Sequence, residues 1–247
     1  MFSFSFVSLS FLSSCINLEK DTDNTLVNQD TSEASDTAQS DTAQSENKPI
    51  EGFGEIEGDC GLLLDLSIED NVFVIQNSID FTDLIFLDSE LSNDSQEILS
   101  DGNLNNGSIY SEVFAFELLY RCEAATLLQT ETEIEYVNPN GKKTDLLISI
   151  QSQSFGVSVT RAFNYPPEDP YTFEAAETLL IDKLSDISMS SENVPAGTWS
   201  RQILSIIAYS TTHALEIENA WESLSEEVKG DTIVYITTTH GNDDFIY

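Results

Sequence analysis

Four oxygen-bearing side chains are spaced so that they could bind a calcium ion. Asp101, Asn103, Asn105 and Glu112 occupy positions 1, 3, 5 and 12 of one loop. Carboxylate and amide oxygens are the ligands that Ca²⁺ prefers, and a loop with this spacing can wrap around the ion. The sixth position holds Asn106 where glycine is expected, although Asn tolerates the left-handed backbone that this position needs. The loop predicts either a calcium-stabilised surface for adhesion or interaction, or a polar loop that caps the next helix.

Two cysteines could form a covalent link. Cys60 and Cys122 would make a disulfide in an oxidising compartment, and closing a loop of that length would stabilise the fold by about 4 kcal/mol. Two separate buried thiols are the alternative, because the sequence gives no distance between them. The two histidines, His213 and His240, are far apart in the sequence, and no Cys/His cluster exists. We therefore do not expect a zinc site.

Complete catalytic motifs are absent from the sequence. It contains no Gly-x-Ser-x-Gly, no glycine-rich phosphate loop followed by Lys, and no His-Glu-x-x-His. Its 44 acidic residues offer many carboxylate pairs for glycoside hydrolysis and no means of choosing among them. Short motifs therefore favour no enzyme class.

The elements that would position these residues follow from hydrophobic periodicity. Residues 50–107 give mixed signals of short strands or turns, and we interpret them as an N-terminal extension of the domain 108–247. In that domain strands alternate with helices, which predicts an α/β fold with a mixed sheet flanked by helices. The predicted elements are, in chain order, helix 111–130, strands 131–137, 145–150 and 155–163, helix 172–188, strand 203–209, helix 211–229 and strand 232–239.

This order of elements resembles the restriction-endonuclease-like fold of the PD-(D/E)XK nuclease superfamily, over about 111–239. In that family an Asp opens the second strand and an acid-x-Lys triplet lies on the third. Two carboxylates then bind a divalent ion while the Lys polarises the attacking water. Asp145 matches the Asp, but the triplet position reads Ser158-Val159-Thr160. The resemblance thus implies a degenerate restriction-endonuclease-like core, in which Asp145 either binds a metal or caps a turn.

Other residues could replace the missing acid and lysine. Lys183 in the following helix or Arg161 on the third strand could supply the cation. Glu112 or Glu117 in the preceding helix could supply the second acid, with Mg²⁺ as the ion. Each has a structural alternative: Lys183 can extend over the core, and Glu117 can pair with Arg121 one helical turn later.

The first 15 residues have the pattern of an export signal. An apolar run from Phe2 to Leu12 is shorter than the roughly 20 residues that a membrane-spanning helix needs. Leu12-Ser13-Ser14-Cys15 resembles the lipobox of bacterial lipoproteins, in which the Cys thiol is acylated and the chain is cut just before it. The resemblance implies a signal peptide over 1–14 and an exported protein that Cys15 anchors in a membrane of the cell envelope. Ile16, which follows the Cys, indicates the outer membrane by the same resemblance.

Residues 15–49 are predicted to be a flexible acidic tether. They are mainly Asp, Ser, Thr, Asn and Gln, and the sequence Asp-Thr-Ala-Gln-Ser occurs at 36–40 and again at 41–45. A segment of this composition cannot bury enough apolar surface to offset the entropy lost on ordering. The tether would hold the domain away from the membrane.

The charge of the chain limits its partners. The formal net charge is -35, and the residues from Ile50 onward carry -29 of it. Such a field repels phosphate backbones, so we do not expect nucleic acid as an electrostatically bound partner. Adaptation to high salt is an alternative explanation of the acidity. A hydrophobic content of 40% supports a folded domain.

These features favour an envelope lipoprotein whose domain is a non-catalytic binding or structural module. Its partners would be the membrane, through the lipid anchor, and an unknown protein. The missing acid-x-Lys pair, the unfavourable charge and the lack of a complete motif argue for this function. The alternatives are a nuclease-like hydrolase that uses Asp145 with Mg²⁺, and an interaction protein stabilised by Ca²⁺.

Overall fold

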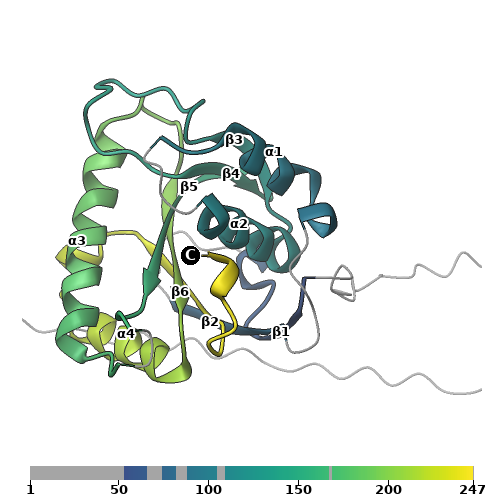
Figure 1. Ribbon diagram of the computed structural model, residues 1–247. Coiled ribbons are helices and arrows are strands. Elements are labelled where there is room, and N and C mark those ends of the chain that lie inside the picture. Colours follow the sequence, from purple (N-terminus) through teal and green to yellow (C-terminus); the bar gives the residue numbers. More distant parts are fainter. Residues whose placement is uncertain (1–52, 66–73, 82–87, 105–108, 167–168, 247) are drawn as a thin grey trace, which may run out of the picture. The chain divides into compact units, whose positions relative to one another are not determined.

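The computed structural model describes residues 53–65, 74–81, 88–104, 109–166 and 169–246, which form one sheet with helices on both faces (Figure 1). The sheet has seven strands in the order β1-β2-β7-β6-β5-β4-β3. The strands are β1 (Glu55–Gly58), β2 (Val74–Asp80), β3 (Thr126–Thr130), β4 (Leu146–Ile150), β5 (Gln153–Ala162), β6 (Arg201–Ala208) and β7 (Ile233–Thr238). The helices are α1 (Asn93–Asp101), α2 (Ile109–Glu123), α3 (Phe173–Glu192), α4 (Thr211–Ser223) and α5 (Glu226–Lys229), with 3₁₀ turns η1 (Leu62–Asp65), η2 (Asp88–Glu90) and η3 (Asp244–Ile246). The predicted fold class, α/β with a mixed sheet flanked by helices, is confirmed.

The strand directions divide the sheet into a parallel centre and antiparallel sides. β2, β7, β6 and β5 run parallel to one another, whereas β1 is antiparallel to β2, and β4 is antiparallel to both β5 and β3. Gln151 and Ser152 join β4 to β5 with φ angles of 47° and 70°, as a tight two-residue hairpin requires. The carboxyl ends of β5, β6 and β7 therefore meet at one edge of the sheet.

Two apolar layers hold the helices against the sheet. On one face α2 packs through Phe114 and Leu118 onto β4, β5 and β7, and on the other face α3 and α4 cover β6 and β7 (Figure 1). α3 presents Ala176, Leu180 and Leu184 to the sheet, spaced four residues apart as one face of a helix requires. β6 and β7 are buried on both faces, which explains why their sequences are almost continuously apolar.

Three predicted elements have the wrong bounds. The helix predicted over 111–130 ends at Glu123, because Ala124 adopts a positive φ of 49° and the chain then pairs with β4 as β3. The strand predicted over 131–137 is wrong, since these residues form turns. The helix predicted over 211–229 is two helices, interrupted by extended backbone at Leu224 and Ser225.

Several predictions concern residues outside the described ranges. These are the signal peptide 1–14, the lipidated Cys15, the tether 15–49 and Asn105 of the calcium loop. Within the described ranges, no helix is long and apolar enough to span a bilayer. The segment 50–107 supplies β1 and β2, which complete the sheet beside β7.

Candidate functional site

Three acidic residues from three elements lie near the amino end of β4. Asp145 directly precedes β4, Glu131 directly follows β3, and Glu112 lies in the first turn of α2. Thr130, the last residue of β3, pairs with Leu146, the first residue of the antiparallel strand β4. Glu131 and Asp145, which lie just beyond this pair, are therefore at the same end of the two strands. The charge of Glu131 raises the pKa values of both Glu112 and Asp145, which places the three side chains near one another. We refer to Glu112, Glu131 and Asp145 as the carboxyl cluster.

Asp145 is fixed by the strand beside it. Its backbone N–H donates to Val157 O (3.0 Å), and its Oδ2 accepts a hydrogen bond from Val159 N (2.6 Å). The pKa of Asp145 is raised to about 6, with burial as the largest cause. The hydrogen bond from Val159 and the ammonium of Lys183 oppose this rise, whereas Glu131 adds to it. Lys183 of α3 is thus close enough to influence the charge of Asp145.

Glu112 is the most strongly perturbed member of the cluster. Glu112 is 8% exposed, and its Oε1 accepts a hydrogen bond from Asn103 Nδ2 (2.8 Å). The pKa of Glu112 is raised to about 8, mainly by burial and further by the charges of Asp145 and Glu131, against the opposing effect of the hydrogen bond from Asn103. Glu112 is therefore mostly protonated at neutral pH, which relieves the repulsion within the cluster.

Glu131 was not predicted as a site residue. It is 3% exposed, and its Oε2 accepts a hydrogen bond from Leu104 N (2.8 Å), which ties the loop after α1 to the end of β3. Its carboxylate also raises the pKa of Tyr136, although burial is the larger cause. The only sequence feature that could have indicated Glu131 is its position directly after β3, before the connection that leads to Asp145. This position can be recognised only when the end of β3 is known.

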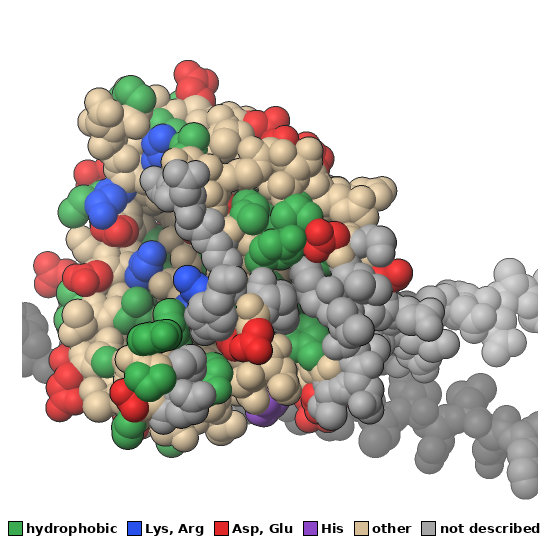
Figure 2. All heavy atoms as spheres, viewed as in Figure 1, with side chains coloured by type: hydrophobic (Ala, Val, Ile, Leu, Met, Phe, Trp, Pro, Cys, Tyr) green, Lys and Arg blue, Asp and Glu red, His purple; other side chains and the backbone are tan. Residues whose placement is uncertain are grey.

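Two lysines precede Asp145 in the chain, and a third lies on α3. Lys142 forms an ion pair with Asp186 of α3 (2.7 Å), and Lys143 Nζ lies 5.3 Å from the centre of the Tyr136 ring. Together with Lys183, these are three of the nine Lys and Arg residues of the chain. Figure 2 shows Lys and Arg side chains gathered on the side of the molecule where α3 lies, on a surface that is otherwise rich in acids. The domain is acidic overall but has a local concentration of cations here.

The strand that should carry the acid-x-Lys triplet carries hydroxyls instead. Phe155 and Val157 of β5 point into the layer under α2, so Ser158 and Thr160 face the opposite side, on which α3 lies. Lys183 of α3 is thus on the same side of the sheet as the position where the resemblance expects a lysine. The structure leaves Lys183 as the residue best placed to supply that charge.

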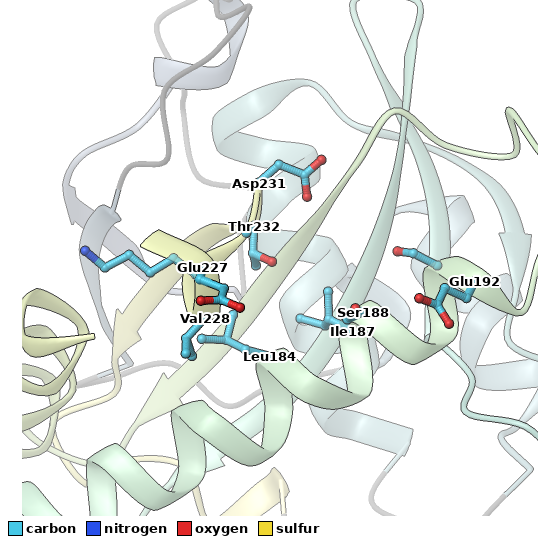
Figure 3. Close-up of a pocket in the computed structure, with 11 residues that line it drawn as sticks. Leu184, Ile187, Ser188, Glu192, Glu227, Val228, Asp231 and Thr232 are labelled. Carbon is cyan, nitrogen blue, oxygen red and sulfur yellow. The ribbon is translucent and has the colours of Figure 1, made fainter. Parts of the chain in front are cut away.

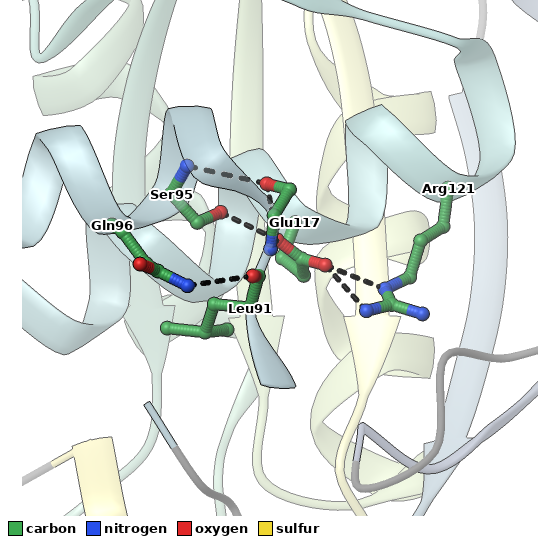
Figure 4. A network of polar contacts seen from close by, with 6 residues as sticks. Leu91, Ser95, Gln96, Glu117 and Arg121 are labelled. Carbon is green, nitrogen blue, oxygen red and sulfur yellow. Dashed lines mark hydrogen bonds and ion pairs between the residues drawn. The ribbon is translucent and has the colours of Figure 1, made fainter. Parts of the chain in front are cut away.

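Glu117 lies in a structural network away from the carboxyl cluster (Figure 4). It is fully buried, and its Oε1 accepts hydrogen bonds from Arg121 Nε (2.8 Å) and Nη2 (2.5 Å). Its Oε2 accepts from Ser92 N (3.1 Å), Ser92 Oγ (2.7 Å) and Ser95 Oγ (2.5 Å). The ion pair with Arg121 is the structural alternative left open by the sequence. With every lone pair used in this way, Glu117 is not available as a metal ligand.

Arg161 points to the opposite face from Thr160. Its Nη1 donates to Ile246 O (3.4 Å), its guanidinium lies 5.2 Å from the centre of the Phe163 ring, and its charge lowers the pKa of Asp243. The contacts described for Arg161 thus lie at the carboxyl end of β5 and in η3. Lys183, and not Arg161, is the cation that the structure places near Asp145.

In the described part of the calcium loop, two of the expected ligands contact each other. Asn103 donates its amide N–H to Glu112 Oε1 (2.8 Å), whereas Asp101 Oδ2 accepts a hydrogen bond from Thr130 Oγ1 (3.1 Å). Glu112 belongs to the carboxyl cluster.

Cys60 and Cys122 form a disulfide, with their Cα atoms 4.6 Å apart. This is one of the two alternatives that the sequence left open. Next to it, the buried carboxylate of Glu123 accepts hydrogen bonds from Gly61 N (3.0 Å) and Leu63 N (2.7 Å). The disulfide and Glu123 together fasten η1 to the end of α2.

A separate pocket of about 290 Å³ lies between α3, α5 and the turn before β7 (Figure 3). Leu184 and Ile187 form its apolar floor, and Glu192 and Glu227 lie at its rim. None of the predicted site residues lines this pocket, although Lys183 belongs to the same helix, α3. It is distinct from the carboxyl cluster.

A divalent ion is compatible with part of the carboxyl cluster. Among the residues that the structure describes, no group of three His, Cys, Asp or Glu side chains is arranged to bind a metal ion. Mg²⁺, however, is commonly bound by only one or two carboxylates together with water and substrate oxygens. Asp145 with Glu131 or Glu112 would provide such a partial set.

Part of this chain is similar to a known protein. The "AAC-rich mRNA clone AAC4 protein" of Dictyostelium discoideum is 34% identical to this chain over 163 residues, which are 64% of this chain and 24% of that protein. The chain thus spans about a quarter of the length of this relative. No protein-family model matches the chain. No solved structure matches it either.

Proposed function

We propose that the domain is a divalent-metal-dependent hydrolase of the nuclease-like kind, built on a restriction-endonuclease-like core. The observation that carries the proposal is the electrostatic link between Asp145, two further carboxyl groups and Lys183. The chain order α2, β3, β4, β5, α3, β6, α4, β7 supports the same inference, because it is the order of helices and strands on which the resemblance rests. The acid and the lysine missing from β5 would then come from other elements.

Each residue of this site has a chemical role in the proposal. Asp145 and Glu131 would bind the ion, and Glu112 would join them after losing its proton. A divalent ion bound there would act as a Lewis acid on the substrate and lower the pKa of a bound water. Lys183 would orient the attacking water and stabilise negative charge that develops during the reaction. The local lysines would offset the repulsion that the acidic domain exerts on an anionic substrate.

The test is cleavage of labelled single-stranded and double-stranded DNA and RNA by the purified protein, with Mg²⁺ or Mn²⁺, at low and high salt. We expect metal-dependent cleavage that Asp145→Asn and Lys183→Gln each reduce by at least about 100-fold, because removal of one charge-stabilising group has effects of this size. Asp231→Asn and Lys229→Gln are matched controls. Asp231 is exposed, and Lys229 pairs with Glu226 within α5.

An absence of cleavage with every substrate and ion would overturn the hydrolase proposal. It would favour the second candidate, a non-catalytic binding or structural module. Two observations support that candidate: Ser158 and Thr160 replace the expected acid and lysine, and the residues from Ile50 onward carry a net charge of -29. Cleavage that persists in Asp145→Asn would show that a different site, or a contaminant, is responsible.

We also propose that the protein is exported and anchored by a lipid at Cys15, in the outer membrane of a cell envelope. The support is the apolar run that ends in Leu12-Ser13-Ser14-Cys15. Incorporation of labelled palmitate that is lost in Cys15→Ser would agree with this. Incorporation that survives the substitution would argue against it.

A further inference from the structure

The pocket between α3 and α5 has an apolar floor. Leu184 and Ile187 of α3 are 3% and 5% exposed, and Val228 of α5, which is 38% exposed, completes the apolar part of the lining. Figure 3 shows Leu184 and Ile187 pointing from α3 toward the segment that leads into β7. Apolar surface in a concave site is stabilised when methylene groups cover it and exclude water.

Carboxylates lie on both walls of this pocket. Glu192 is the last residue of α3, Glu227 belongs to α5, and Asp231 lies between α5 and β7; all three are exposed. Asp231 has a cation beside it, because Arg201 Nε donates to Asp231 O (2.7 Å). Glu192 and Glu227 form no ion pair with any residue that the structure describes. These two carboxylates are thus available to a cation that enters the pocket.

The lysine in the lining of the pocket is engaged elsewhere. The ammonium of Lys229 pairs with Glu226 (2.9 Å) and lies 5.4 Å from the centre of the Trp221 ring. Neither Glu226 nor Trp221 lines the pocket. The last turn of α3 carries no basic residue, so the negative end of the helix dipole adds to the charge of Glu192. The electrostatic field in the pocket therefore favours a cation.

An arginine side chain matches both the apolar floor and the carboxylates. Its methylene stem packs on apolar surface while its planar guanidinium donates hydrogen bonds to carboxylates. The volume of about 290 Å³ is at the lower end for ligand sites, and thus suits one side chain better than a large ligand. The net charge of -29 on the residues from Ile50 onward would attract a basic segment toward this surface.

We propose that this pocket is a docking site for a basic segment of a partner protein, which inserts an arginine side chain. The stem of the arginine lies on Leu184 and Ile187, and its guanidinium binds Glu192 and Glu227. The pocket lies beside the amino end of β7, whereas the carboxyl cluster is at the amino end of β4. Docking of the partner therefore does not depend on the proposed hydrolase activity.

The test is isothermal titration calorimetry of the purified full chain with a capped peptide of repeated Gly-Ser-Arg units. We expect binding that is lost when citrulline replaces arginine, because citrulline keeps the shape of the side chain without its charge. The double variant Glu192→Gln/Glu227→Gln should bind about 10-fold more weakly, the scale of two exposed ion pairs. Ser188→Trp, at an exposed position in the lining, should fill the pocket and weaken binding at least as much without a change of charge.

Two matched variants separate the pocket from the general charge of the domain. Glu97→Gln/Glu174→Gln removes the same charge at exposed positions of α1 and α3, and Ser185→Trp adds an indole at an exposed position of α3; none of these residues lines the pocket. Both should be folded by circular dichroism and bind the peptide like wild type. If they lose as much affinity as the pocket variants, or if the citrulline peptide binds equally well, the proposal fails. Binding of spermidine without binding of the peptide would indicate a site for small cations and would also overturn it.

Discussion

Glu112 links the carboxyl cluster to the stability of the fold. A group whose pKa is higher in the folded than in the unfolded chain binds its proton more tightly in the native state. The stabilisation is therefore complete at a pH below the ordinary Glu value and is lost as the pH rises to about 8, the folded pKa of Glu112. Asp145 acts in the same direction, with a folded pKa of about 6. The native state is thus expected to become less stable between about pH 4 and pH 8.

Glu112→Gln should flatten this pH dependence. Glutamine keeps the size of the side chain and cannot ionise, so the variant no longer loses the stability that Glu112 gives to the protonated form. From the raised pKa we expect wild type to lose on the order of a few kcal/mol between pH 5 and pH 8, and the variant markedly less. Urea unfolding at the two pH values measures this. Glu97→Gln, at an exposed position of α1, should behave like wild type; an equal pH slope in all three proteins would contradict the assignment.

Some site residues were open to prediction from the sequence and others were not. Asp145 stands at a recognisable place after a turn, and Glu112 and Lys183 lie on helices whose apolar faces are clear. Glu131 was missed because the predicted helix ran on through β3, which placed it in the wrong element.

At the scale of elements, α1 and α2 are joined by one buried carboxylate. Glu117 of α2 accepts hydrogen bonds from Ser92 and Ser95 at the start of α1, and from Arg121 on its own helix. Ser92 Oγ also caps α1 by accepting from Ser95 N (3.2 Å). The network therefore fixes where α1 begins and how it lies on α2.

Removing Glu117 should destabilise the fold far more than removing one of its partners. Glu117→Ala leaves the Arg121 guanidinium buried without its carboxylate, and we expect a loss of about 3–5 kcal/mol in the free energy of unfolding. Ser95→Ala removes one charged hydrogen bond, with an expected loss of about 1–3 kcal/mol. Chemical denaturation measures both. A smaller loss for Glu117→Ala than for Ser95→Ala would refute this account of the network.

The bounds of elements were harder to predict than their order. Apolar residues occur on both sides of the boundary between α2 and β3, and the positive φ of Ala124 marks the change from helix to strand. The turns at 131–137 alternate acid and apolar residues like a strand, but Ile134 serves a small separate apolar cluster with Leu147 and Val194. In both cases tertiary packing overrides the local pattern.

At the scale of the whole molecule, the Cys60–Cys122 disulfide ties the N-terminal part of the described chain to α2. The two residues are separated by 62 positions. A cross-link over a loop of that length should stabilise the fold by about 4 kcal/mol, mainly by restricting the unfolded chain. Glu123 reinforces the link through its hydrogen bonds to η1.

Loss of the disulfide should lower the melting temperature without changing the fold. We expect the double variant Cys60→Ala/Cys122→Ala to lose about 4 kcal/mol, and wild type treated with a thiol reductant to approach it. Thermal unfolding followed by circular dichroism, with and without reductant, measures this. The reductant should have no effect on the double variant. Equal stability of wild type and the double variant would show that the cross-link contributes nothing.

The pairing of β2 with β7 has a consequence for how the chain acquires its structure. Asn77 of β2 accepts a hydrogen bond from Thr237 of β7, 160 positions later in the sequence. Contacts this remote in sequence form slowly, because the entropy of closing a long loop must be lost before any of them is gained. The centre of the sheet therefore cannot be completed until β7 has been synthesised. Until then, the edge of β2 that pairs with β7 has no partner strand and needs protection from aggregation.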